Sequence, residues 1–224
     1  MGKTGTANMP CWDTEAELAG CGKGAGLIAG VDEAGRGPWA GPVVAAAVMF
    51  RAGDRLDGLN DSKKLKAGQR DALYTQIRER AIVGVGIISV QDIDRINILQ
   101  ATMMAMRSAV EQLAEPASTV LVDGNRCPGM PCKAVPVVKG DALCPSISAA
   151  SIVAKVTRDR LMIELGEDYP EYGWRDNKGY GTAAHSEAIA IFGVTPHHRR
   201  SFAPIRAALE QRTNIKASFT QSVD

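Results

Sequence analysis

Residues 27–50 read LIAGVDEAGRGPWAGPVVAAAVMF, and this stretch decides the fold. The apolar run from Leu27 to Val31 suits a buried β-strand, and it ends in two adjacent carboxylates, Asp32 and Glu33. Side chains alternate faces along a strand, so both carboxylates reach one site only if the backbone turns at once. The Gly-Arg-Gly turn that follows gives the backbone this freedom. A solvated turn after a strand is the alternative interpretation.

Length and composition describe a globular protein without an overall charge preference. The chain has 224 residues, of which 45% are hydrophobic, enough for one domain with an appendage or for two small domains. Its 26 basic and 25 acidic residues leave a net charge of +1, so any site for a polyanion is local. The sequence contains neither an apolar run of the ~20 residues that span a membrane nor a signal-peptide pattern. We therefore expect a cytoplasmic protein that does not bind membranes.

The cysteines are odd in number and follow no CxxC spacing, which argues against a disulfide framework and against a zinc site. We expect reduced thiols at all five positions: Cys11, Cys21, Cys127, Cys132 and Cys144.

Hydrophobic periodicity predicts an α/β chain with five strands. Apolar and β-branched runs predict strands over 27–31, 42–50, 81–90, 118–122 and 134–138, the second being a hairpin partner of the first. Helical spacing predicts helices over 67–80, 91–115, 146–165, 183–192 and 204–211. The resulting organisation is a flexible extension over 1–26, a main α/β domain over 27–165, a small helical segment over 166–212 and a flexible tail over 213–224.

A second predicted strand repeats the pattern found at Asp32. The β-branched run from Ser118 to Val122 also ends in a carboxylate followed by glycine, Asp123-Gly124. An Asp-Gly pair alone commonly marks a turn. Two strands that both end in aspartate are more informative than either one.

The helix predicted over 146–165 carries a polar stripe. Ser151, Lys155 and Asp159 are spaced at i, i+4 and i+8, so they lie along one face. One interpretation is a solvent-exposed face with an ion pair between Lys155 and Asp159, worth ~0.3–0.5 kcal/mol. The other is a stripe that faces a functional site.

Four carboxylates are therefore candidate metal ligands and catalytic groups: Asp32, Glu33, Asp123 and Asp159. Gathered together, they would repel one another and take up protons unless cations bind. Hard divalent cations such as Mg²⁺ or Mn²⁺ prefer oxygen ligands, and two of them ~3.5–4 Å apart can activate water against a phosphodiester. No Ser/His/Asp pattern competes with this interpretation. The adjacent His197 and His198 are more typical of packing or phosphate contacts than of metal ligands.

Seven motifs of the chain, in order, resemble those of the ribonuclease HII family, also called type 2 ribonuclease H. They are AGVDEAGRGP (29–38), LNDSKKL (59–65), VDGN (122–125), VKGD (138–141), ISAASIVAKVTRD (147–159), KGYGT (178–182) and HHRRSF (197–202). The resemblance covers about residues 27–211 and implies a ribonuclease H-like mixed five-stranded sheet flanked by helices, with a small C-terminal helical segment. Asp32, Glu33, Asp123 and Asp159 match the family's metal-binding and catalytic carboxylates.

The resemblance also implies an activity. The family cuts RNA in RNA–DNA hybrids and nicks duplex DNA on the 5′ side of single embedded ribonucleotides, leaving 3′-hydroxyl and 5′-phosphate ends. It uses Mg²⁺ or Mn²⁺, and its substrates point to ribonucleotide excision repair. We expect a monomer whose partners are RNA–DNA hybrids and ribonucleotide-containing duplex DNA.

Substrate contacts carry over in the same way. The turn formed by Gly35, Arg36 and Gly37 matches the motif that grips the 2′-hydroxyl, which alone distinguishes ribose from deoxyribose. Tyr180 matches the tyrosine that packs on the next, deoxy, sugar, although a tyrosine between glycines is also a common surface anchor. Further candidate substrate contacts, most of them to phosphates, are Lys63, Lys64, Ser151, Lys155, Lys178 and Arg200.

Three other functions are weighed against this one. A two-metal nuclease for plain DNA would use the same carboxylates. A non-catalytic hybrid-binding module would have the carboxylates as ordinary turns and an ion pair. A nucleotide-cofactor oxidoreductase is the weakest, because the GxGxxA match at 24–29 precedes a strand, whereas a dinucleotide fingerprint follows one.

Overall fold

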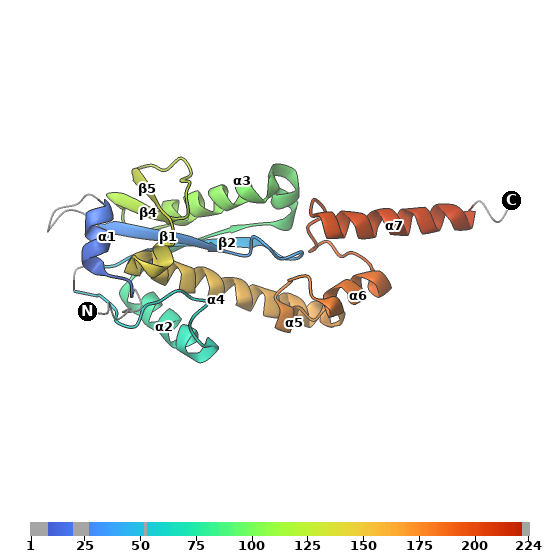
Figure 1. The fold of residues 1–224 in the computed structure, drawn as a ribbon, viewed down its shortest axis with the longest axis horizontal. Helices are drawn as coiled ribbons and strands as arrows, with labels where there is room; N and C mark the ends of the chain where they lie inside the picture. The colour runs from blue at the N-terminus through green and yellow to red at the C-terminus, as the bar shows by residue number, and fades with distance from the viewer. Residues whose placement is uncertain (1–8, 20–26, 52, 221–224) are drawn as a thin grey trace, which may run out of the picture. The chain divides into compact units, whose positions relative to one another are not determined.

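The computed structural model describes residues 9–19, 27–51 and 53–220 (Figure 1). The chain divides into two compact units. The first unit lies within residues 1–34, 44–87 and 102–157, and the second within residues 35–43, 88–101 and 158–224. The chain thus passes repeatedly from one unit to the other, and the Gly-Arg-Gly turn belongs to a different unit from the strand before it.

A mixed five-stranded sheet is the framework for the candidate site. Its strands are β1 (Ile28–Ala34), β2 (Val43–Met49), β3 (Ile82–Ile88), β4 (Thr119–Asp123) and β5 (Lys133–Val137), in the spatial order β3-β2-β1-β4-β5. β1 pairs antiparallel with β2 and parallel with β4, and β4 pairs parallel with β5. β1 is therefore the central strand (Figure 1). The five predicted strands are confirmed.

The helices are α1 (Trp12–Ala19), α2 (Ala67–Arg80), α3 (Val90–Glu111), α4 (Pro145–Asp168), α5 (Trp174–Asn177), α6 (Ala183–Phe192) and α7 (Ala203–Thr220). Two 3₁₀ turns, η1 (Gly140–Ala142) and η2 (Pro170–Tyr172), complete the elements. Each predicted helix has a counterpart, while α1 and the short α5 were not predicted. Within the described residues, no helix has the length and apolarity that a membrane span requires.

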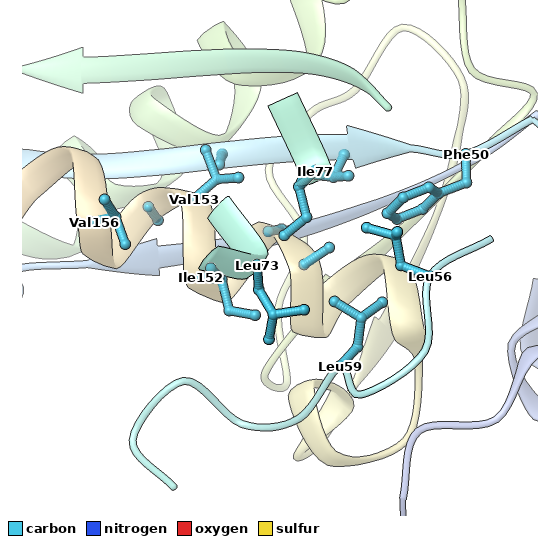
Figure 2. Close-up of a cluster of buried hydrophobic side chains, with 13 residues drawn as sticks. Phe50, Leu56, Leu59, Leu73, Ile77, Ile152, Val153 and Val156 are labelled. Carbon is cyan, nitrogen blue, oxygen red and sulfur yellow. The ribbon is translucent and has the colours of Figure 1, made fainter. Parts of the chain in front are cut away.

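A hydrophobic cluster holds α2 and α4 against the sheet in the first unit (Figure 2). Its labelled side chains, none more than 9% exposed, are Phe50, Leu56, Leu59, Leu73, Ile77, Ile152, Val153 and Val156. Burying one such side chain contributes about 1.5–3 kcal/mol, so the cluster fixes α4 firmly. The polar stripe of α4, on the helix's other side, is thereby fixed as well.

β1 and the start of α4 touch backbone to backbone. A Cβ atom added at Gly30 would lie 2.2 Å from the backbone nitrogen of Ile147. Because no side chain larger than hydrogen fits there, glycine in the middle of β1 brings the helix close to the strand that carries Asp32.

The second unit has its own core, built from aromatic rings. Tyr172 and Trp174 stack with ring centroids 5.2 Å apart, and both are almost fully buried. The indole N–H of Trp174 donates to Nε2 of His185 at 3.1 Å, and the Tyr172 hydroxyl donates to the Gly193 carbonyl at 2.8 Å. Each polar tip in this core therefore has a partner, which buried Trp and Tyr require.

The N-terminal segment differs from the prediction of a flexible extension over 1–26. Trp12–Ala19 forms helix α1, and the Trp12 ring meets Phe50 edge-on with centroids 5.4 Å apart. The guanidinium of Arg55 lies 5.0 Å from the centroid of the same ring. So short a helix is stabilised by tertiary contacts, which periodicity does not reveal. Residues 1–8 and 20–26 of the predicted extension, which include Cys21 and the glycines of the GxGxxA match, lie outside the described residues.

Two further differences concern helix boundaries. α7 continues to Thr220, whereas a flexible tail was predicted from residue 213. α3 is interrupted at Asn97, whose backbone has φ 68° and ψ 162°. The Asn97 side-chain oxygen accepts hydrogen bonds from the N–H groups of Leu99 and Gln100 at 3.0 and 3.2 Å, so it caps the second helical segment.

Candidate active site

Asp32 and Asp123 lie side by side on neighbouring parallel strands. Asp123 is the last residue of β4, whereas β1 does not end before Asp32 as predicted. It continues to Ala34, because Asp32 and Glu33 still pair with Ala46 and Ala45 of β2, so the backbone does not turn directly after the two carboxylates. Val31 of β1 pairs with Val122 of β4, and each aspartate is the next residue on its strand. Parallel neighbours are about 4.8 Å apart, and residues in register point to the same side of the sheet. The two carboxylates predicted from separate strand ends are therefore brought together.

Asp32 is a buried carboxylate surrounded by like charge. Its side chain is 7% exposed, and burial raises its pKa well above the usual value of 3.8, with further increases from the charges of Glu33 and Asp123. Hydrogen bonds from the Ser151 hydroxyl and from the Glu33 N–H, 2.7 Å from Oδ1, act in the opposite direction. Hydrogen bonds from Ser151 and from the Glu33 N–H thus hold the Asp32 carboxylate in place, although burial and the neighbouring carboxylates disfavour its negative charge.

Asp123 is oriented by the backbone that follows β5. The N–H of Gly140 donates to its Oδ1 atom at 2.7 Å. Burial raises the pKa of Asp123, and the charge of Glu33 raises it further, while Lys63 and the backbone N–H groups of Gly140 and Asp141 lower it. A turn predicted from Lys-Gly-Asp at 139–141 therefore serves to position a site carboxylate.

Asp141 is a member of this acidic group that the sequence interpretation missed. Its pKa is raised by burial first and then by the charges of Asp123 and Asp61. It lies in η1, directly after the glycine that binds Asp123. The VKGD motif contains Asp141 and could have marked it as a site residue. A Lys-Gly-Asp sequence is equally typical of a solvated turn, however.

A buried pair of serines links α4 to the loop before α2. The hydroxyls of Ser62 and Ser151 are 2.9 Å apart, and both residues are buried. Ser62 is followed by the exposed lysines Lys63 and Lys64, and the charge of Lys63 acts on both Asp123 and Asp141. Ser151, predicted as a substrate contact, contacts Asp32 in the structure.

The remaining predicted residues divide between the two units. Lys155, half-buried on α4, belongs to the first unit, whereas Asp159, also half-buried on α4, belongs to the second. The other substrate-contact candidates of the second unit are Gly35, Arg36, Gly37, Lys178, Tyr180 and Arg200. Tyr180 is 46% exposed, and a Cβ atom at Gly37 would lie 3.6 Å from its ring, so the turn and the tyrosine are neighbours within this unit.

His198, one of two buried histidines among the described residues, has a packing role. His198 is 1% exposed, and its Nε2 atom lies 3.0 Å from Nε2 of His185. Its Nδ1 atom accepts a hydrogen bond from the Thr195 N–H at 3.0 Å. His198 therefore has the packing role that was one of the two alternatives expected for it.

The donor set suits a hard divalent cation, although the site is not a closed cage. Among the described residues, no three His, Cys, Asp or Glu side chains are gathered as tightly as a metal-holding group. The acidic groups offer only oxygen donors, and the pKa of Asp32 is raised by burial first and then by the negative charges of Glu33 and Asp123. A divalent cation with oxygen ligands removes the repulsion among these charges.

Comparison with known proteins identifies the family of this chain. A family model described as Ribonuclease HII matches residues 29–205. Proteins named Ribonuclease HII from Paracidovorax citrulli (strain AAC00-1) and Jannaschia sp. (strain CCS1) are each 54% identical to the chain, over 87% and 89% of it and over 82% and 98% of the relatives. The crystal structure of ribonuclease H2 from Pyrococcus horikoshii OT3 superposes with a TM-score of 0.70 at 30% identity, covering 83% of this chain and 98% of that one. The predicted ribonuclease H-like fold is thereby confirmed, and the chain belongs to the ribonuclease HII family of metal-dependent endoribonucleases.

Proposed function

We propose that the protein hydrolyses the RNA strand of RNA–DNA hybrids and nicks duplex DNA on the 5′ side of single embedded ribonucleotides, leaving 3′-hydroxyl and 5′-phosphate ends. The observation that carries this proposal is the pair Asp32 and Asp123, adjacent on parallel strands and electrostatically coupled. Membership of the ribonuclease HII family gives the substrate class.

The proposed ligands of two Mg²⁺ or Mn²⁺ ions are Asp32, Glu33, Asp123 and Asp159. When bound, such ions supply an activated water and stabilise the leaving oxygen of a phosphodiester. The protein's own contribution is orientation. The Ser151 hydroxyl holds Asp32, and the Gly140 N–H holds Asp123. Hydrogen bonds of this kind set the position and basicity of carboxylates that bind metals.

Recognition of the substrate is proposed to divide between phosphate contacts and sugar contacts. The exposed Lys63 and Lys64, together with Lys155, Lys178 and Arg200, would contact phosphates, which position a duplex without reading its sequence. The Gly35–Gly37 turn would sense the 2′-hydroxyl, and the exposed Tyr180 would pack on the neighbouring deoxyribose. The near-neutral net charge requires such a local patch.

A nicking assay tests the proposal. A duplex carrying one ribonucleotide is incubated with the protein and Mg²⁺ or Mn²⁺, and the product ends are mapped. We expect one nick on the 5′ side of the ribonucleotide, no cut in the all-DNA duplex, and loss of the nick in Asp123→Asn. Asp57→Asn, an exposed aspartate in the loop after β2, is the matched control and should nick as the wild type does.

Each other outcome indicates a different function. Cutting of the all-DNA duplex at a similar rate would indicate a general nuclease. Binding of the hybrid without a metal-dependent product, or a nick that survives Asp123→Asn, would contradict the catalytic role of the carboxylates.

A further inference from the structure

Two buried arginines lie beneath the turn that follows β1. Arg158 is 1% exposed and Arg199 is not exposed at all, and both belong to the second unit, as does the turn. Their guanidinium groups donate hydrogen bonds to backbone carbonyls. Both arginines lie within motifs that resemble those of the family, but the resemblance assigned neither of them a role.

Arg199 joins the two ends of the loop over residues 35–42. Its Nη2 donates to the carbonyl of Gly35 at 2.6 Å, and its Nη1 donates to that of Arg36 at 3.0 Å. At the other end, Nε donates to Gly41 at 2.9 Å and Nη2 to Pro42 at 3.1 Å. One planar, rigid guanidinium therefore fixes four peptide planes of the loop.

Arg158 fixes different parts of the same region. It donates to the carbonyls of Ala40, Pro42 and Lys178, each at 3.0 Å. Gly35 has φ +95°, and a Cβ atom there would lie 2.0 Å from Nε of Arg158, so only glycine can pack against this arginine. Arg158 thus supports the loop from behind but does not bind the carbonyls of Gly35 or Arg36.

Burying both guanidinium groups is costly. Burial lowers the pKa of Arg199 to about 9, and the charge of Arg158 contributes to that decrease. Burial lowers the pKa of Arg158 to about 10. Replacing buried charges by apolar groups often stabilises a protein, so stability alone is a weak reason for two of them at one loop. The hydrogen bonds of the two arginines to loop carbonyls suggest another reason for burying them, which is to fix the backbone conformation of the loop.

The geometry of the peptide group links Arg199 to the exposed side of the turn. In a trans peptide the N–H points opposite to the C=O of the same plane. With the carbonyls of Gly35 and Arg36 directed at Arg199, the N–H groups of Arg36 and Gly37 point away from it. Arg36 and Gly37 are the exposed residues of the turn, whereas Gly35 is buried.

We infer that Arg199 is a positioning residue for ribose recognition: it orients the Gly35–Gly37 turn so that the Arg36 and Gly37 N–H groups face the substrate. This inference rests on the proposed function, in which that turn senses the 2′-hydroxyl. Arg199 itself lies behind the turn and does not contact the substrate.

The test compares two buried arginines of similar exposure. Arg199→Lys and Arg158→Lys are measured beside Arg206→Lys, an exposed control on α7. The affinities for a duplex with one ribonucleotide and for the same all-DNA duplex are measured in Ca²⁺, with thermal unfolding recorded for each variant. Arg199→Lys should reduce the ribonucleotide preference roughly tenfold or more, since misplacing a positioned group by about 1 Å has effects of up to about a hundredfold. The all-DNA affinity should stay unchanged.

Arg158→Lys should lose less preference than Arg199→Lys at a comparable loss of stability, and Arg206→Lys should lose none. If both buried variants lose the same amount of ribonucleotide preference, or if Arg199→Lys keeps the wild-type preference, the inference is overturned. Arg199 would then have a structural role only. A wild-type protein that does not nick the ribonucleotide duplex would instead overturn the proposed function.

A structure of the wild-type protein with a ribonucleotide-containing duplex in Ca²⁺ gives a second test that needs no variant to fold. The Gly35 and Arg36 carbonyls should keep their bonds to Arg199 while an Arg36 or Gly37 N–H contacts the ribonucleotide. Carbonyls turned away from Arg199 in that complex would contradict the inference.

Discussion

The carboxylate of Glu15 in α1 accepts a hydrogen bond of 2.8 Å from the backbone N–H of Ser146, at the second residue of α4. The first N–H groups of a helix have no partner within it, and negative charge is favourable there. Glu15 is therefore a cap supplied by a distant helix, and it connects the N-terminal segment to the helix that carries Ser151.

The burial of Glu15 predicts a specific pH dependence of stability. Burial raises its pKa from 4.5 to about 6. The folded state then binds this proton more tightly than the unfolded state, so the contribution to stability is full below pH 4.5 and is lost as the pH rises through 6. Glu15→Gln, which keeps an acceptor for Ser146, should gain about 2 kcal/mol over the wild type between pH 4 and pH 8.

Urea unfolding of the two proteins across this range measures the difference. Glu17→Gln, at an exposed position on the same helix, is the matched control. A difference between Glu15→Gln and the wild type that does not change with pH would contradict the prediction.

The His185–His198 pair should make the second unit sensitive to acid. Burial lowers the pKa of His198 from 6.5 to about 3, and burial also lowers the pKa of His185. Below pH 6.5 the histidines of the unfolded chain bind protons, whereas the buried His198 of the folded state stays neutral. The free energy of unfolding therefore falls as the pH drops towards 3. For His198 the slope approaches about 1.4 kcal/mol per pH unit between its two pKa values, and the lowered pKa of His185 acts in the same direction. His198→Gln should show a shallower loss of unfolding free energy between pH 6 and pH 4; an equally steep loss would show that other groups cause it.

Ser151→Ala should impair catalysis without unfolding the protein. The change removes the hydroxyl that bonds Asp32 and that lies 2.9 Å from the Ser62 hydroxyl. Loss of such a supporting hydrogen bond typically costs about ten- to hundredfold in metal affinity or activity. The nicking rate and its dependence on Mg²⁺ concentration measure the effect, with Ser186→Ala, exposed on α6, as the control. Wild-type kinetics in Ser151→Ala would show that Asp32 needs no support from this serine.

Two glycine-to-alanine changes should shift stability in opposite directions. Gly30→Ala would force a Cβ atom to within 2.2 Å of the Ile147 backbone and separate β1 from α4, which should cost several kcal/mol. A Cβ atom at Gly68, in the first turn of α2, meets nothing within 4 Å, so Gly68→Ala should stabilise by about 0.5–1 kcal/mol. Thermal unfolding of both variants decides the matter; a tolerated Gly30→Ala would mean that the strand and helix are not in contact.

Hydrophobic periodicity predicted the five strands, and the repeated aspartate pattern marked Asp32 and Asp123 as candidates for one site. Their adjacency depends on the parallel pairing of β1 and β4, which periodicity does not give. Periodicity also missed the last residues of β1, since Asp32 and Glu33 are polar but still pair with β2. Periodicity could not reveal α1, because eight residues held by Trp12 and Glu15 depend on contacts with distant parts of the chain.

The sequence also did not predict that two charged side chains, Arg158 and Arg199, are buried. Arg158 precedes Asp159 on a helix, and Arg199 stands in a run of polar residues, so local sequence favours exposure for both. Only the carbonyls of a distant loop make their burial possible. Asp141 was missed for a related reason, since its nearness to Asp123 depends on how the chain turns after β5.

The most direct test of the central claim is anomalous diffraction from crystals of the protein soaked in MnCl₂. We expect Mn²⁺ bound between the carboxylates of Asp32 and Asp123, and its loss in Asp123→Asn. Crystals in which Mn²⁺ binds elsewhere, or in which Asp123→Asn leaves the bound ion unchanged, would contradict the assignment of this pair as the metal site.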